Sequence, residues 1–207
     1  RDVYTIPVTG GVPQRITWHP AAETLCDWTP SGTLLVSTNA FAGLSRMPQL
    51  FTVSADNPDY EALPVPYGTN GALHRDGEWL AYTPFSRDTR TWKRYRGGMA
   101  SDIWLFNLKD RSSKQVTDWE GTDSYPMWHG GTLYYLSDAG PAHRLNIWKY
   151  NIESGESTQV TKFKKFDVKY PSIGPGSDGK GEIVFQLGAD LRLLDLNSTK
   201  SKTIEVT

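Results

Sequence analysis

Short apolar segments alternate along this chain with polar turns that contain glycine. Four segments combine aliphatic, aromatic and β-branched residues in the way that is typical of strands: TLLVST from Thr33, EWLAYT from Glu78, TLYYLS from Thr132 and EIVFQL from Glu182. Each follows a turn, TPSG, HRDG, WHGG or GSDG, where glycine permits tight backbone conformations. The pattern predicts a chain of strands with almost no helical periodicity.

A second motif recurs downstream of these segments. It joins a polar residue, an aliphatic residue and a third large residue, and it returns at intervals of 44 to 53 residues: Asp2-Val3-Tyr4, Gln49-Leu50-Phe51, Asp102-Ile103-Trp104, Asn146-Ile147-Trp148 and Asp190-Leu191-Arg192. A turn and a closing strand follow each copy: QRIT, EALPV, KQVT, TQVT and KTIEV. Units of four strands at this spacing are typical of β-propeller blades.

The repeats predict an all-β fold, a β-propeller built from four-stranded antiparallel blades. Residues 1–17 supply the last two strands of one blade, and full blades occupy 18–67, 68–119, 120–164 and 165–207. These are four and a half blades of an expected six. An open ring leaves a sheet edge and blade faces uncovered. We therefore expect upstream sequence to complete the ring, or an oligomeric or edge-to-edge assembly to cover those surfaces.

The order of the blade sequences is similar to that in tricorn proteases. VSTNAFAGLSRMPQLFTV, WKRYRGGMASDIWLFNL, LYYLSDAGPAHRLNIWKYN and YPSIGPGSDGKGEIVFQLGADLRLLDL resemble successive blades of the six-bladed N-terminal propeller of that family. The run WKRYRGG is the most specific of them. The turns and the Asp-Ile-Trp triplet also resemble the wider group of TolB and tricorn propellers, and the resemblance covers essentially the whole chain.

This resemblance implies a noncatalytic propeller module in a tricorn-like serine protease. In that family the six-bladed ring is regarded as a passage for substrate or product, and the catalytic Ser, His and Glu lie in other domains. The expected partners are other domains or subunits of the parent protease, with peptides possible, and the expected location is cytoplasmic. The alternative is a TolB-type propeller scaffold that binds a partner protein. Sequence beyond Thr207 would discriminate between the two.

Composition and motifs exclude several other functions. The net charge of -1 gives no overall electrostatic attraction to nucleic acid or to an anionic membrane. The single cysteine, Cys26, is interpreted as a small buried hydrophobic residue. The four histidines, His19, His74, His129 and His143, fall in different blades without metal-ligand spacing. We expect no cofactor, no metal and no catalytic residue in this chain.

The candidate binding residues lie in one oversized loop between Phe85 and Ser101. They are Arg87, Arg90, Trp92, Lys93, Arg94, Tyr95 and Arg96. Because long loops on a rigid scaffold often carry function, they are predicted to form a cationic and aromatic lip at one mouth of the pore. The loop is interpreted equally well as a contact to another domain or subunit and as a local structural element, with direct peptide binding third.

Two further residue classes receive structural interpretations. The acidic residues that open the third strands, Asp2, Asp102 and Asp190, lie too far apart around a ring to act as a catalytic pair, and we expect them to cap turns. Most of the eight tryptophans, including Trp28, Trp79 and Trp128, are expected to pack between blades.

Overall fold

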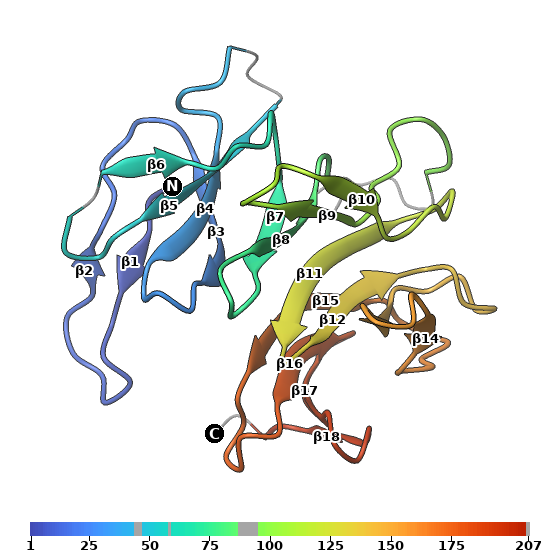
Figure 1. Ribbon diagram of the computed structural model, residues 1–207. Coiled ribbons are helices and arrows are strands. Elements are labelled where there is room, and N and C mark those ends of the chain that lie inside the picture. The colour runs from blue at the N-terminus through green and yellow to red at the C-terminus, as the bar shows by residue number, and fades with distance from the viewer. Residues whose placement is uncertain (44–46, 58, 87–94, 206–207) are drawn as a thin grey trace.

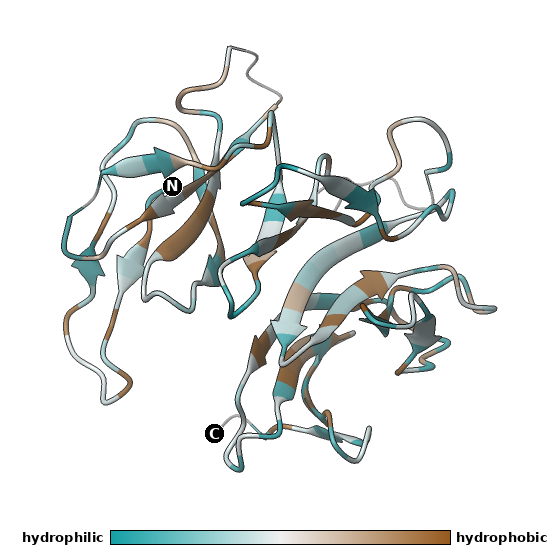
Figure 2. Cartoon of the chain, in the orientation of Figure 1, coloured by the Kyte–Doolittle hydropathy of each residue, from teal (hydrophilic) through white to brown (hydrophobic). Residues whose placement is uncertain are grey.

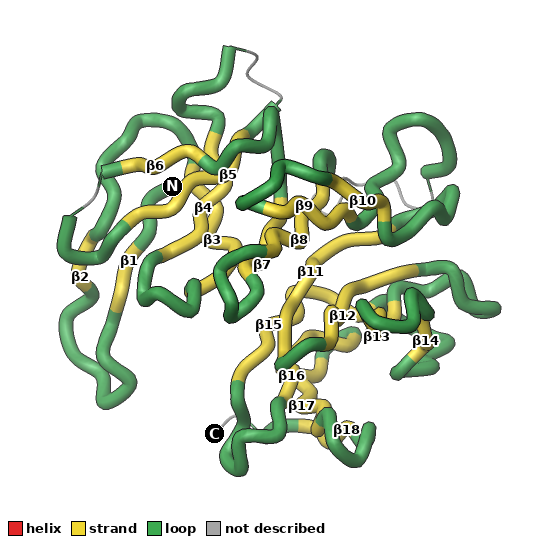
Figure 3. The backbone as a smooth tube through the Cα atoms, viewed as in Figure 1, coloured by secondary structure: helices red, strands yellow, loops and turns green. Residues whose placement is uncertain are grey.

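The computed structural model consists of strands joined by turns and loops (Figures 1 and 3). It describes residues 1–43, 47–57, 59–86 and 95–205. Within those ranges there are four four-stranded sheets and one two-stranded sheet, all with antiparallel neighbours. The all-β propeller prediction is confirmed.

Each sheet is a blade whose strands follow one another in chain order. The half blade contains β1 (Tyr4–Thr5) and β2 (Gln14–Arg15). The first blade contains β3 (Glu23–Trp28), β4 (Leu34–Thr38), β5 (Gln49–Val53) and β6 (Tyr60–Ala62). The second contains β7 (Asn70–Leu73), β8 (Trp79–Thr83), β9 (Trp104–Asn107) and β10 (Ser113–Gln115).

The third and fourth blades follow the same plan. The third contains β11 (Asp123–His129), β12 (Thr132–Ser137), β13 (Asn146–Asn151) and β14 (Ser157–Gln159). The fourth contains β15 (Val168–Gly174), β16 (Glu182–Leu187), β17 (Asp190–Asp195) and β18 (Ser201–Thr203). The first strands of successive blades, β3, β7, β11 and β15, contact one another along the middle of the molecule (Figure 1). They are the inner strands of the propeller.

The core lies between blades, where the apolar faces of neighbouring sheets meet. Figure 2 shows the most hydrophobic residues along the strands and hydrophilic residues in many of the turns. Leu34 and Val36 of the first blade pack against Val3 and Ile16 of the half blade. Phe185 of the fourth blade packs with residues of the third. Because each blade buries apolar surface only against its neighbours, stability is distributed along the array rather than held in one centre.

In three places, a threonine hydroxyl at the end of a blade forms a hydrogen bond with the third strand of the same blade. The backbone N–H of Val3, Ile103 and Ile147 donates to the hydroxyl of Thr17, Thr117 and Thr161, respectively, at 2.9 Å in each case and across 14 residues. All three hydroxyl groups belong to buried residues. The recurrent threonine that ends QRIT, KQVT and TQVT therefore satisfies a backbone donor that the strand ladder leaves free.

Two of the structural interpretations from sequence need correction. Asn146 does cap a turn, accepting from the backbone N–H of Phe163 at 2.8 Å, but Asp2 forms an ion pair with Arg15 and Asp102 accepts from Gln115. Trp79 and Trp128 pack against the core between the second and third blades. Trp28 does not, because its side chain is exposed.

Candidate functional site

The four inner strands line a central cavity of about 360 Å³. Its walls come from residues 24–28 of β3, 70–72 of β7, 125–127 of β11 and 171–173 of β15. A second cavity of about 420 Å³ lies where these strands turn into the next ones, lined by residues from all four turns. Asp27, Trp28 and Ile173 border both cavities. The two spaces therefore adjoin along the inner strands, and together they are called the channel below.

Bulges in three of the inner strands shape the wall of this channel. The pairing register shifts between Leu25 and Asp27, between Ser124 and Met127, and between Lys169 and Ser172. At two of them a Tyr-Pro pair is present, and the tyrosine adopts a left-handed backbone with φ of 53° at Tyr125 and 48° at Tyr170. Bulges redirect side chains and concentrate near functional sites, as does strained backbone.

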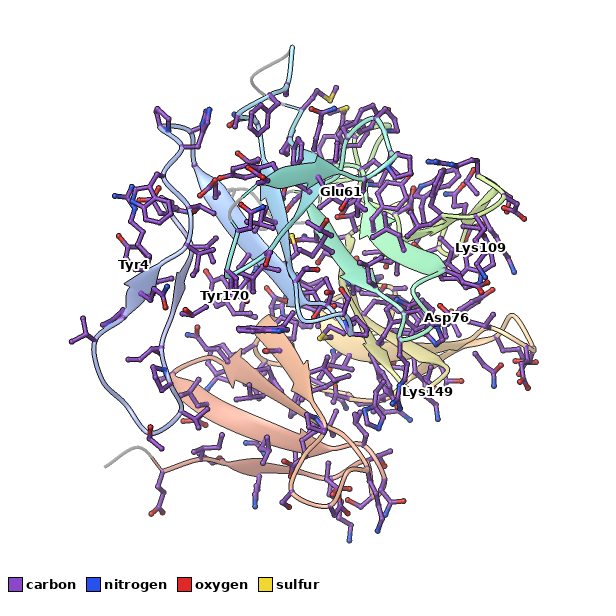
Figure 4. All side chains as sticks on the ribbon, turned by 60° about the vertical axis from the view of Figure 1, so that its left-hand side comes forward. Tyr4, Glu61, Asp76, Lys109, Lys149 and Tyr170 are labelled. Carbon is purple, nitrogen blue, oxygen red and sulfur yellow. The ribbon has the colours of Figure 1, made fainter. Side chains whose placement is uncertain are left out.

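Large apolar side chains are exposed on these strands. Leu25 is 48% exposed and Trp28 is 58% exposed, and both line the central cavity. Tyr170, next to the lining residue Pro171, is 63% exposed (Figure 4). Exposed apolar residues gathered in a concave site are typical of ligand surfaces. The channel wall can therefore contact apolar groups of a passing molecule.

Charged groups are few along the channel and lie at its turn end, whereas neutral polar residues such as Thr24, Asn70 and Ser172 line the central cavity. Arg75 and Asp27 both border the second cavity. Burial raises the pKa of the Asp27 carboxyl to about 6, against the opposing effect of backbone N–H donors from Trp28 and Leu73. Cys26 lines the central cavity, and burial raises the pKa of its thiol to about 12. A thiol held in the protonated form is a poor nucleophile.

Two histidines of this end connect neighbouring blades. His74 of the second blade lies with Nε2 3.1 Å from the carbonyl of Gly130, and its ring contacts Trp128 edge-on, with centroids 4.8 Å apart. The ring of His129 lies over Gly181 of the fourth blade, where a Cβ atom would come within 2.7 Å of it. His74 and His129 therefore each contact the next blade.

The oversized loop lies between the second and third strands of the second blade. Arg87, Arg90, Trp92, Lys93 and Arg94 lie outside the described residues, whereas Tyr95 and Arg96 lie within them. Arg96 forms an ion pair with Glu120 of the connection to the third blade. Its guanidinium lies 5.0 Å from the ring centroid of Trp119. This end of the loop therefore adjoins the rim on which blades are joined.

Trp119 extends the contacts of Arg96 to the third blade. Its indole N–H donates to Asp138 at 2.7 Å, and its ring is nearly parallel to that of His143, with centroids 6.1 Å apart. The sequence patterns used for prediction gave no sign of this cluster, because Trp119, Asp138 and His143 occupy unremarkable positions in their blades. Arg96 therefore has contacts within the chain, and its role in binding stays a prediction.

In the described residues, metal-ligand groups and membrane-spanning helices are two further features that would indicate a function. Within them, no group of three or more His, Cys, Asp or Glu side chains is placed to hold a metal ion. They also include no helix that could cross a membrane. The exposed Leu25 and Trp28 side chains enable the channel wall to contact apolar groups of another molecule.

Comparisons with the sequences of known proteins agree with the propeller fold of this chain. Residues 1–200 match the model of the tricorn protease N-terminal β-propeller domain. A tricorn protease homologue from Streptomyces coelicolor is 32% identical over 141 residues, which are 66% of this chain and 13% of that protein. The tricorn protease of Thermoplasma acidophilum is 24% identical over 99% of this chain and 19% of its own length. The chain thus spans less than a fifth of these relatives.

Solved structures show the same fold. The crystal structure of the tricorn protease superposes with a TM-score of 0.80 at 23% identity, over 99% of this chain and 20% of that one. TolB from Acinetobacter baumannii superposes with a TM-score of 0.73 at 17% identity, over 99% of this chain and 48% of that one. Because the family model matches residues 1–200 of the 207, this chain belongs to the tricorn protease N-terminal β-propeller domains.

Proposed function

We propose that this domain is a noncatalytic module of a tricorn-like serine protease, in which it provides a passage for peptides and a surface for assembly with other domains or subunits. The observation that carries the proposal is the pair of adjoining cavities along the inner strands, in a chain that belongs to this family. Its wall exposes Leu25 and Trp28 and includes a thiol that is kept protonated. Catalysis is assigned to the rest of the parent protein.

The wall suits an extended peptide better than a small polar molecule. Apolar and aromatic surface contacts many side chains without strong selectivity, whereas specific small-molecule sites place several polar groups around one ligand. Arg75 and Asp27 provide both charges near one end, where they can attract either terminus or a charged side chain. Transit requires such weak contacts, because tight binding would slow release.

Narrowing the channel in the parent protein tests the passage. Ser172 lines the central cavity and is exposed, so Ser172→Trp places a large side chain in the channel. Ser113→Trp is the matched control, because Ser113 lies exposed on the outermost strand of its blade. We expect Ser172→Trp to lower turnover of long peptides severalfold and to leave a short chromogenic peptide unaffected. Equal turnover of long peptides by both variants would count against a passage.

The noncatalytic part of the proposal is tested with the isolated 207-residue chain. We expect no hydrolysis of peptides that the parent protein cleaves. Hydrolysis that copurifies with the chain through successive columns, and that is lost when the Cys26 or His129 side chain is removed, would overturn this part alone.

A further inference from the structure

The junctions between blades carry a repeated set of polar residues that the passage does not use. Each set has three members. A leading residue lies at or just before the start of the third strand, a threonine closes the blade, and an acidic residue follows six positions after that threonine. The sets are Asp2, Thr17 and Glu23; Asp102, Thr117 and Asp123; and Asn146, Thr161 and Asp167. Their charges differ, although their backbone contacts are the same.

The set of the half blade balances its two carboxylates. The Thr17 hydroxyl donates to one oxygen of Glu23 and the Tyr60 hydroxyl donates to the other. Arg15 pairs with Asp2 at 2.7 Å and donates from Nε to the Thr17 carbonyl at 2.9 Å. One guanidinium therefore accompanies two carboxylates.

The set of the third blade has a single carboxylate. Its leading residue is the neutral Asn146, whose side-chain oxygen accepts from the Thr161 hydroxyl at 2.9 Å. Asp167 accepts from the backbone N–H of Leu145 at 3.2 Å. No second negative charge needs to be balanced here.

The set of the second blade has two carboxylates and lacks the arginine. Gln115 stands where Arg15 stands in the half blade, and it donates to the Thr117 carbonyl at 2.8 Å and to Asp102 at 3.2 Å. An amide makes these contacts without supplying charge. The single hydroxyl hydrogen of Thr117 can serve only one of Asp102 and Asp123.

Several oxygens of this junction are buried and lack hydrogen-bond partners in the described part of the chain. They are both carboxylate oxygens of Asp123, Oδ1 of Asp102 and the hydroxyl of Ser101. Asp123 and Ser101 are each only 1% exposed. The Ser101 carbonyl accepts the Asp123 backbone N–H at 2.9 Å, so these residues are neighbours. Buried carboxylates are normally paired or bound to a cation, because an unpaired buried charge is costly.

The Ser137 and Thr117 hydroxyls lie near the Asp123 carboxyl, but both are neutral and neither meets the geometry of a hydrogen bond with it. Gln115 supplies no charge at the place where the half blade has Arg15.

We propose that Asp102 and Asp123, with the Ser101 hydroxyl, bind a hard divalent cation at the junction between the second and third blades. All the donors are oxygens, two of them are carboxylates, and Ca²⁺ accepts irregular sets of oxygen ligands more readily than Mg²⁺ does. The ion takes the place of the guanidinium in the half blade. Because Ser101 ends the oversized loop, the bound ion also fixes the base of that loop.

The test uses the full 207-residue chain with Ca²⁺ as the probe. At neutral pH, we expect the melting temperature in excess CaCl₂ to exceed that in EDTA by about 5 °C or more once free calcium is about 100-fold above Kd. Isothermal titration calorimetry is expected to give one calcium ion per chain. MgCl₂ at the same concentration is expected to give a smaller shift.

Three variants distinguish this site from general ion effects. Asp102→Asn and Asp123→Asn are expected to weaken calcium binding at least tenfold. Gln115→Arg restores the residue of the half blade, so it is expected to raise the melting temperature in EDTA and to abolish the calcium response. Asp2→Asn is the matched control at the equivalent position, and its calcium response is expected to equal that of the wild type.

Two results would overturn the proposal. The first is a wild-type chain whose melting temperature and titration heats do not respond to calcium, which would mean that a shared proton or water satisfies the pair. The second is a calcium response that persists in the Asp102→Asn/Asp123→Asn double variant. Gln115→Arg and the single variants keep the test decisive if the double variant does not fold.

Discussion

The threonine that closes each blade gives the sharpest prediction about stability. Thr161→Val keeps the shape of the side chain and removes the hydroxyl that accepts from Ile147 and donates to Asn146. An unsatisfied buried N–H costs about 1–3 kcal/mol, and the hydrogen bond to Asn146 contributes about 1 kcal/mol. The additional buried methyl group offsets about 0.8 kcal/mol. We therefore expect a net loss of about 1–3 kcal/mol in the free energy of unfolding.

Urea denaturation followed by tryptophan fluorescence measures this loss. With a slope of about 2–3 kcal/mol/M, the midpoint is expected to fall by roughly 0.3–1.5 M. Thr158→Val is the control, since Thr158 is exposed on β14 and the same change there is expected to stay within about 0.5 kcal/mol. If the two variants had equal midpoints, the hydroxyl would have no role in holding the blade together, and the reasoning would be wrong.

Three further predictions concern single contacts and pH. Gly181 has φ of 92° and lies against the His129 ring, whereas Gly179 has φ of 76° and open space around it. In thermal melts, Gly181→Ala is therefore expected to cost about 1–3 kcal/mol more than Gly179→Ala. Equal losses of stability would contradict the contact with His129. Trp119→Phe removes a hydrogen-bond donor from the buried Asp138 carboxyl and is expected to lower the free energy of unfolding by about 1–3 kcal/mol. The control, Trp28→Phe in the channel, is expected to lower it by less than about 0.5 kcal/mol. Urea midpoints measure both changes. Burial raises the pKa of Asp123 to about 7, so the folded state holds this proton more tightly than the unfolded state does. In EDTA, the contribution of Asp123 to stability is therefore fully present below about pH 4 and is lost as the pH rises through about 7; Asp123→Asn is expected to remove this contribution to the slope, and an unchanged slope would place the titration elsewhere.

The architecture could be predicted from sequence because its causes are local and repeated. Glycine turns, β-rich segments and the triplet at the third strand specify one blade, and repetition specifies the propeller. The roles of individual residues were less accessible. Trp28 has the same pattern as the packing tryptophans, yet it is exposed, and it ends a strand whose pairing register shifts between Leu25 and Asp27. A bulge depends on how two strands pair, which a single strand sequence does not reveal.

The candidate site was likewise predictable only in part from sequence. The long loop was recognised by its length and charge, but the partners of Arg96, Glu120 and Trp119, come from the next interblade connection. The imbalance at Asp102 and Asp123 was equally hidden. Gln115 and Arg15 are both ordinary polar residues in a strand, and only the comparison of their contacts shows that one supplies a charge and the other does not.

Differences in length among the blades are concentrated in one kind of loop. The loop between the second and third strands covers residues 39–48, 84–103, 138–145 and 188–189 in the four blades, while the three threonine links all span 14 residues. The loops between the second and third strands therefore differ widely in length, whereas in these four blades the turns between the third and fourth strands are all five or six residues long. An engineer who wishes to add a binding peptide or a reporter to this scaffold would insert it in a loop of the first kind, where the blades already accept different lengths.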